Sequence, residues 1–244
     1  MPVEPVAVSD LPVMILTGPP GAGKSTAMRT FRHSFPGLDH FGVRVFFQRQ
    51  IELGTPLGVR AAVFHESRVW HPDEMILEGI ALWLDQTLPD ATRIVFESFP
   101  RNASQARAVD GLLAERGLRV NRVVSLDVPD EICAARVTGR EVCVECDTIV
   151  ADAIPVPGSA CPHCGRELVR RPDDDRPTFL RRLARQRQGA VELLAHYEAR
   201  GVLVRVDGTR PPAEVAQALL EAARTAPDAA QLKGDPENTA KVAG

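Results

Sequence analysis

Residues 18–26, GPPGAGKST, carry the pattern of a phosphate-binding loop, G-x-x-x-x-G-K-[ST]. They follow a short apolar run that we predict to be a strand, and they open a segment with helical periodicity. Glycines in this pattern let backbone N–H groups converge on phosphate oxygens, while the lysine reaches the β and γ phosphates and the serine contacts Mg²⁺. The sequence therefore predicts a nucleotide site built from Gly18, Gly21, Ala22, Gly23, Lys24, Ser25 and Thr26.

Four of the five cysteines form two C-x2-C pairs, which have the spacing of a four-thiolate zinc site. The pairs are Cys143 with Cys146 and Cys161 with Cys164. Gly165 suits the knuckle turn after the second pair. His163 lies inside that pair, so a Cys3His set is an alternative, but the symmetry of the pairs favours four sulfurs. We expect a structural Zn²⁺, with iron as the alternative metal, that supplies much of the folding free energy of a small module.

Short β-branched runs alternate with helix-like segments along the chain. The runs are Val13–Leu16, Leu38–Val43, Arg93–Phe96, Arg122–Leu126 and Val202–Val206, of which the second is the weakest. This alternation predicts an α/β fold with a five-stranded parallel sheet wrapped by helices, of the P-loop NTPase type. The fifth cysteine, Cys133, lies in a helical pattern and is predicted to be a small core residue.

The sequence also suggests where the chain divides. We predict an N-terminal extension at 1–11 and an α/β core, which carries the phosphate-binding loop, made of 12–141 and 171–225. Residues 142–170 contain the paired cysteines and lack helical or strand periodicity over most of their length, so we assign them to an inserted zinc-ribbon lid. Residues 226–244 are polar without apolar periodicity, and we expect a mobile tail there.

Composition narrows the class of protein. Hydrophobic residues make up 44% and charged residues 25% of the 244 residues, which suffices for a sizeable core. A net charge of −3 gives no basic surface for nucleic acid or for an anionic membrane. The apolar run Leu11–Leu16 is far too short to span a bilayer. We therefore predict a cytoplasmic protein, most simply a monomer, that binds neither nucleic acid nor membrane.

A second group of motifs resembles one enzyme family. Glu97-Ser98-Phe99-Pro100-Arg101, followed by Gln105, resembles the D-G-F-P-R-x-x-x-Q segment of adenylate kinases. Further pieces follow in the family's order: Arg136 with Arg140, Arg171-Pro172-Asp173-Asp174, Arg182, and Gly208 with Arg210. Such ordered agreement is hard to reach by chance. The resemblance covers about residues 12–222, and it includes the zinc-binding lid of the family's long form.

The resemblance implies roles for these residues, and phosphoryl transfer explains why so many are arginines. Negative charge spreads over equatorial oxygens, and arginine forks bind phosphate bidentately while staying charged. The implied catalytic set is Lys24, Arg101, Arg140, Arg171 and Arg182. The implied ATP-binding set adds Arg136, Arg140, Gly208 and Arg210 to the phosphate-binding loop. The implied acceptor-binding set is Ser98, Arg101, Gln105, Gln48, Arg171 and Arg182. Glu97 would hold a Mg²⁺-bound water, and Asp173 and Asp174 would orient the arginines.

The acceptor-binding segment, about residues 42–72, departs from the family pattern. Alignment on the residues after it places Val43 at the family's threonine, Val45 at its aspartate and Gln48 at its arginine. Ser98 replaces the glycine that lets the acceptor base approach the backbone. A register shift of one residue would bring Arg44 or Arg49 toward the missing phosphate contact. The identity of the acceptor is therefore the open point.

The prediction is a phosphotransferase, adenylate kinase-like, that moves the γ-phosphoryl of Mg-ATP onto a nucleoside monophosphate, foremost AMP. A kinase for another phosphorylated small molecule is the first alternative, and an ATP-binding pseudoenzyme or regulator is the second. The retained arginines argue against a pseudoenzyme, since nucleotide binding alone does not need them. A zinc-ribbon nucleic-acid module is a third class, but residues 142–170 contain no Phe, Tyr or Trp for base stacking.

Overall fold

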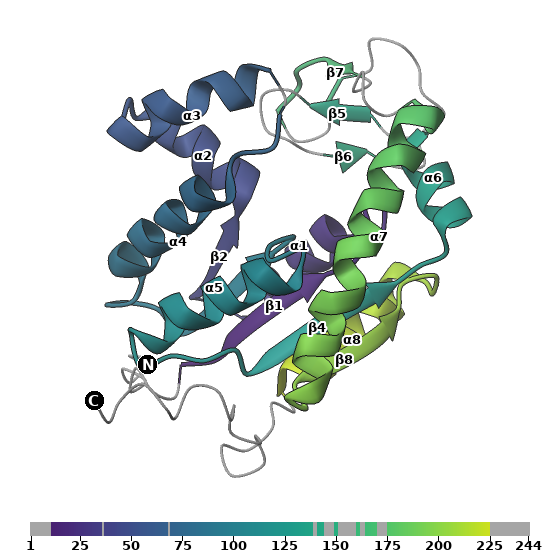
Figure 1. Cartoon of the computed structure of the whole chain (residues 1–244). Coiled ribbons are helices and arrows are strands. Elements are labelled where there is room, and N and C mark those ends of the chain that lie inside the picture. Colours follow the sequence, from purple (N-terminus) through teal and green to yellow (C-terminus); the bar gives the residue numbers. More distant parts are fainter. Residues whose placement is uncertain are drawn as a thin grey trace.

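A five-stranded parallel sheet forms the centre of the molecule (Figure 1). The computed structural model describes residues 11–35, 37–67, 69–138, 141–143, 149–150, 160–161, 164–169 and 175–224. The strands are β1 Val13–Thr17, β2 Leu38–Gly42, β3 Arg93–Glu97, β4 Arg122–Asp127 and β8 Leu203–Asp207. They lie in the order β2-β3-β1-β4-β8, and every neighbouring pair is parallel. The predicted α/β fold is confirmed, including the strand near residues 38–43 whose pattern was weakest.

Eight helices connect and cover these strands among the described residues. They are α1 Lys24–Ser34, α2 Val43–Glu52, α3 Pro56–Glu66, α4 Asp73–Thr87, α5 Ala103–Ala114, α6 Asp130–Thr138, α7 Arg176–Ala199 and α8 Pro212–Arg224. Capping residues fix several of the helix starts. Asn102 accepts from the Gln105 backbone N–H at 2.9 Å to begin α5, and Asp175 accepts from the Thr178 N–H at 3.0 Å to begin α7.

The sheet divides the interior into two apolar layers, because successive side chains of a strand point to opposite faces. Ile15 and Phe96 pack in the layer covered by α4, α5 and the C-terminal half of α7. Leu16 and Val124 pack in the other layer, with α1, α6 and α8. Cys133 lies fully buried in this second layer, as predicted. Since both faces are covered, the strands read in sequence as nearly continuous apolar runs.

A second, small sheet lies beyond the carboxyl edge of the large one (Figure 1). It consists of β5 Glu141–Cys143, β6 Ile149–Val150 and β7 Leu168–Val169, paired antiparallel in the order β6-β5-β7. Strands of two or three residues are too short to show a period of two, which is why the sequence pattern did not reveal them. In Figure 1 this sheet faces α2 and α3 across the space above the large sheet.

Other predictions about the organisation of the chain stay predictions. The boundaries drawn between core, acceptor-binding segment and lid are of this kind. The N-terminal extension, apart from Leu11, and the tail at 226–244 lie outside the described residues. Within the described part of the chain, no helix has the length and apolar character needed to cross a bilayer.

Candidate active site

The phosphate-binding loop lies between β1 and α1, at the carboxyl edge of the sheet. Gly18, Gly21 and Gly23 have φ values of 138°, 82° and 95°, which L side chains rarely adopt. A Cβ at Gly21 would also lie 2.7 Å from the backbone oxygen of Cys133 in α6. Glycine at this position therefore allows both the turn of the loop and its close approach to α6. The backbone N–H groups that open α1 from Lys24 onward form the kind of terminus that binds phosphate.

Lys24 and Ser25 link the loop to its surroundings. The Lys24 ammonium donates to the backbone oxygens of Gly18 and Pro19, each at 2.8 Å, so it lies across the loop. The Ser25 hydroxyl donates to Oε1 of Glu97, at the end of β3, at 3.2 Å. Because β1 and β3 are neighbours, the tertiary structure brings together two motifs that are 72 residues apart.

Glu97 has a further partner, His40 of β2, which sequence reasoning missed. His40 Nε2 lies 2.9 Å from Glu97 Oε2, and His40 Nδ1 lies 2.6 Å from an Arg32 guanidinium nitrogen. A guanidinium can only donate, so Nδ1 must accept, and the ring proton of a neutral His40 lies on Nε2. Burial alone would raise the pKa of Glu97, but His40, Lys24 and Ser25 outweigh burial and lower it. Glu97 is therefore an anion at neutral pH.

Arg101 lies in the turn between β3 and α5 and is half-buried. Its Nε donates to the backbone oxygen of Ser98 at 2.9 Å, and its Cζ lies 3.3 Å from the centroid of the Trp70 ring. Burial, followed by the charge of Arg182, lowers the pKa of Arg101 to about 10, against the opposing effect of Asp73. The guanidinium stays charged at neutral pH, and its weakened hydration favours an anionic ligand.

Gln105 lies in the first turn of α5 and is hydrogen-bonded at both ends of its amide. Its Oε1 accepts from the Arg101 backbone N–H at 2.7 Å, and its Nε2 donates to Asp73 of α4 at 2.8 Å. Trp70 falls in the predicted acceptor-binding segment, about residues 42–72, but neither Trp70 nor Asp73 is among the predicted site residues. The available signal was their position at the start of α4, with Trp70 just before the helix and Asp73 as its first residue. Their place opposite the β3–α5 turn becomes visible only once the sheet is assembled.

The predicted ATP-base residues come together at the end of β8. Arg136 of α6 donates to the backbone oxygen of Gly208 at 2.9 Å. A Cβ at Gly208 would lie 2.6 Å from Val128 and 3.3 Å from the backbone oxygen of Ala22, so only glycine lets this loop approach the phosphate-binding loop so closely. Arg210 is exposed and lies 3.7 Å from Asp207.

The other predicted site residues differ in their surroundings. Gln48 is exposed and donates to Glu52 on its own helix at 3.1 Å, so its amide forms a hydrogen bond on the surface of α2. Arg182 lies close enough to Arg101 for its charge to affect the pKa of Arg101. The remaining predicted residues, Arg140, Cys146, Arg171, Asp173 and Asp174, lie outside the described residues.

Three of the four predicted zinc ligands gather in the small sheet. The sulfurs of Cys143, Cys161 and Cys164 all lie within 4.8 Å of one another, and those of Cys143 and Cys164 are 3.4 Å apart. The Gly165 N–H donates to the Cys161 backbone oxygen at 2.8 Å, and Gly165 has a φ of 74°, which closes a tight knuckle turn. Sulfurs at these separations suit tetrahedral Zn²⁺, whose bonds to sulfur are about 2.3 Å long.

The comparison with known proteins decides the family. A sequence profile described as "Adenylate kinase" matches residues 16–202, which is more than half of the chain. The chain belongs to the adenylate kinase family. This family member is 34% identical to an adenylate kinase of Sphingopyxis alaskensis over 201 residues, 81% of this chain and 91% of the relative. It is 35% identical to an adenylate kinase of Symbiobacterium thermophilum over 214 residues, 86% of this chain and 98% of the relative.

Membership of the adenylate kinase family makes the chain an enzyme, a phosphotransferase with nucleoside monophosphate kinase activity. Its fold carries the phosphate-binding loop and the Arg101 turn on neighbouring strands, β1 and β3. Ligands of open parallel sheets bind at this carboxyl edge, where the loops of adjacent strands diverge.

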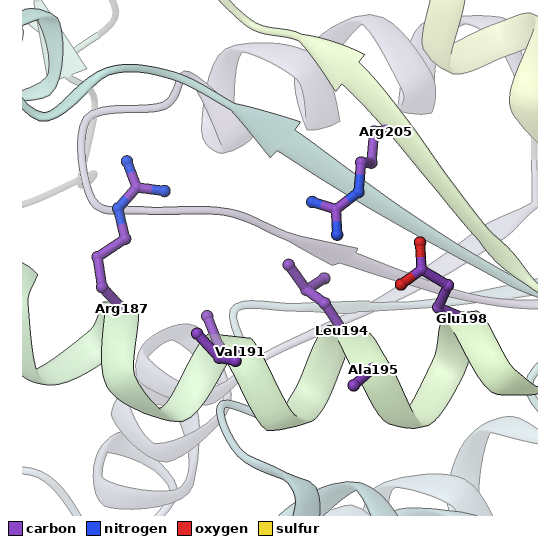
Figure 2. Close-up of a pocket in the computed structure, with 7 residues that line it drawn as sticks. Arg187, Val191, Leu194, Ala195, Glu198 and Arg205 are labelled. Carbon is purple, nitrogen blue, oxygen red and sulfur yellow. The ribbon is translucent and has the colours of Figure 1, made fainter.

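A separate hollow lies between α7 and β8, away from the predicted site residues. It has a volume of about 350 Å³, and its lining includes Arg187, Val191, Leu194, Glu198 and Arg205 (Figure 2). Both arginines already have carboxylate partners. Arg187 lies 2.6 Å from Asp130, and Arg205 lies 3.3 Å from Asp127. The charges of the two arginines are therefore already balanced by these carboxylates.

Proposed function

We propose that this member of the adenylate kinase family transfers the γ-phosphoryl of Mg-ATP to AMP. The observation that carries the proposal is the pairing of Arg101 with Gln105 beside the phosphate-binding loop. A half-buried guanidinium suits the phosphate of an acceptor, and an oriented side-chain amide suits the edge of a base. An acceptor held there would lie next to the nucleotide on Lys24 and Ser25.

In this proposal each group of residues has a separate task. The phosphate-binding loop and Lys24 hold the triphosphate, while Arg136 and Gly208 border the ATP base. Arg101 and Arg182 bind the acceptor phosphate and the transferring phosphoryl. Arg140 and Arg171 join them, as the family resemblance implies. Positioning and neutralisation of charge dominate this chemistry, so no residue has to form a covalent intermediate.

Magnesium fits the oxygen atoms at the start of α1 and at the end of β3. The Ser25 hydroxyl and the ionised Glu97 carboxylate, 3.2 Å apart, are hard oxygen donors of the kind that Mg²⁺ prefers, directly or through water. When bound, the ion would neutralise charge on the β and γ phosphates. His40 and Arg32 keep the carboxylate oriented toward this position.

The zinc site would stabilise the small sheet rather than take part in transfer. Cys143, Cys161 and Cys164 fit three ligands of a structural zinc, and Cys146 would supply the fourth. We propose that the resulting module acts as a lid that excludes water from the transferring phosphoryl. A cytoplasmic location and a monomeric state remain predictions.

A second candidate function is a kinase for another phosphorylated acceptor. Gln48, which stands at the family's arginine, bonds to Glu52, and Val45, which stands at the family's aspartate, is 56% exposed. These two positions offer no charged contact to an AMP phosphate. The retained Arg101 still requires an anionic acceptor, so the candidates differ in the body of the acceptor molecule and share its phosphate.

Formation of ADP from Mg-ATP, measured with AMP, dAMP, GMP, CMP, UMP, dTMP and sugar phosphates, tests the proposal. Selective use of AMP supports it, whereas selective use of another acceptor supports the second candidate. Lys24→Ala should abolish transfer to every acceptor. Arg101→Ala should lower kcat/KM for the acceptor by a factor that corresponds to a loss of about a few kcal/mol of transition-state stabilisation. Arg107→Ala, an exposed position in the helix α5 that follows Arg101, is the control. Unchanged turnover in Arg101→Ala would move the acceptor site elsewhere.

A further inference from the structure

The two predicted acceptor-reading side chains, Arg101 and Gln105, are both held by one short stretch of chain. Trp70 precedes α4, and Asp73 is the first residue of α4. Trp70 lies against the Arg101 guanidinium, and Asp73 accepts from the Gln105 amide. Two residues three positions apart therefore contact both groups that would recognise the acceptor.

Trp70 contacts the flat face of the Arg101 guanidinium, so this contact does not involve the N–H groups of Arg101. A cation lying 3.3 Å from the ring centroid is attracted by the negative face of the indole. Guanidinium N–H groups point outward in the plane, so stacking does not compete with a phosphate for them. Among the described residues, Nε donates to Ser98, and the stack fixes the plane in which the other two nitrogens lie.

Asp73 determines which way round the Gln105 amide lies. A backbone N–H can only donate and a carboxylate can only accept, so Oε1 must face Arg101 and Nε2 must face Asp73. Each amide atom keeps capacity for one more hydrogen bond. The order of acceptor and donor that meets a base is thereby fixed. Adenine presents an amino donor beside a ring acceptor, whereas guanine presents the reverse order along the same edge.

We propose that Trp70 and Asp73 are positioning residues for the acceptor, Trp70 acting on the phosphate through Arg101 and Asp73 on the base through Gln105. The inference rests on the proposed function, because it assumes that Arg101 and Gln105 bind the acceptor. It adds a division of labour. Loss of Trp70 weakens the binding of all phosphorylated acceptors by the same factor, whereas loss of Asp73 changes the preference between acceptor bases.

The first experiment replaces Trp70. Trp70→Leu should raise KM for AMP and for GMP by the same factor, about 3-fold to 30-fold, with KM for ATP unchanged. Val69→Ala is the matched control, because Val69 is the exposed neighbour in the same loop. Trp70 is 38% exposed, so the substitution leaves little of the core disturbed.

A spectroscopic readout follows from the tryptophan content of the chain. The chain has two tryptophans, and Trp83→Phe leaves Trp70 as the sole reporter. Titration of that variant with AMP should change the Trp70 emission to saturation as the phosphate engages the stacked guanidinium. Adenosine, which has no phosphate, should leave the emission unchanged.

The second experiment replaces Asp73. Asp73→Ala should lower the ratio of kcat/KM for AMP to kcat/KM for GMP by about 3-fold to 10-fold, because the amide loses the partner that fixes its orientation. Asp73→Asn keeps an oxygen that can accept from Nε2, so it should restore most of the ratio. Glu74→Ala removes the same charge from the same first turn of α4 and should leave the ratio unchanged.

The outcomes separate this inference from the proposed function. A wild-type enzyme that uses none of the acceptors refutes both. A wild-type enzyme that uses AMP while Trp70→Leu keeps a normal acceptor KM, or Asp73→Ala keeps the normal base preference, refutes the inference alone. Equal loss of base preference in Asp73→Ala and Glu74→Ala also refutes it, because the effect would then come from the charge of the helix turn.

Discussion

Ser98 occupies a backbone conformation that favours glycine, and replacing it should stabilise the protein. Its φ is 63°, in the left-handed region. A non-glycine residue in this region costs about 1–2 kcal/mol. Glycine loses more backbone entropy on folding, about 0.5–1 kcal/mol. The difference between the central values of these two ranges predicts that Ser98→Gly raises the free energy of unfolding by about 0.5–1 kcal/mol.

Gly54 provides a matched control of opposite sign. It has the same φ of 63°, and a Cβ added there would meet no atom within 4 Å. Gly54→Ala therefore isolates the backbone term and should lower the free energy of unfolding by about 0.5–1 kcal/mol. The two variants should shift Tm by about 1–4 °C in opposite directions for a chain of this size.

Urea unfolding followed by circular dichroism measures both free energies, and a thermal scan checks the direction of each shift. The slopes of free energy against urea should match the wild type, because neither change alters the surface exposed on unfolding. A less stable Ser98→Gly variant, or a Gly54→Ala variant as stable as wild type, would refute the reasoning. Either result would mean that the left-handed conformation costs less here than the entropy of the glycine.

Three further predictions concern other parts of the molecule. Cys143→Ser should lower bound zinc, measured by elemental analysis, below one ion per chain and make thermal unfolding begin earlier, and a strong chelator should do the same to wild type. Burial, followed by the charge of His65, lowers the pKa of His71 below its ordinary 6.5. The stability that the neutral His71 ring contributes is therefore fully present above pH 6.5 and is lost as the pH falls through the folded pKa. His71→Phe should therefore lose less free energy of unfolding than wild type between pH 7.5 and pH 5.5, both pH values being about one unit from the ordinary pKa. Asp110→Asn should cost about 2 kcal/mol in denaturant unfolding, because the half-buried Arg200 guanidinium, 2.6 Å from Asp110, loses its carboxylate; an Asn variant as stable as wild type would show that solvent replaces that partner.

Local patterns predicted much of this molecule because they obey local rules. The phosphate-binding loop can be recognised in the sequence because its glycines and Lys24 must follow one another within a single turn between a strand and a helix. The strands of the central sheet are legible because burial on both faces demands apolar runs. The cysteine pairs are legible because a zinc knuckle fixes their spacing, and Cys143, Cys161 and Cys164 do gather as that spacing requires.

The contacts between distant segments could not be predicted in this way. Neither His40 nor Trp70 stands in a motif, and each gains a partner only when the order β2-β3-β1-β4-β8 is set. The pairing of β2 with β3 brings His40 to Glu97, and the packing of α4 beside α5 brings Asp73 to Gln105. Such contacts depend on which strands become neighbours. The order of the strands is determined by the burial of whole faces of the sheet and not by any short run of residues. The sequence by itself thus determined the chemistry that the site requires, and the tertiary structure decided which residues hold those groups in place.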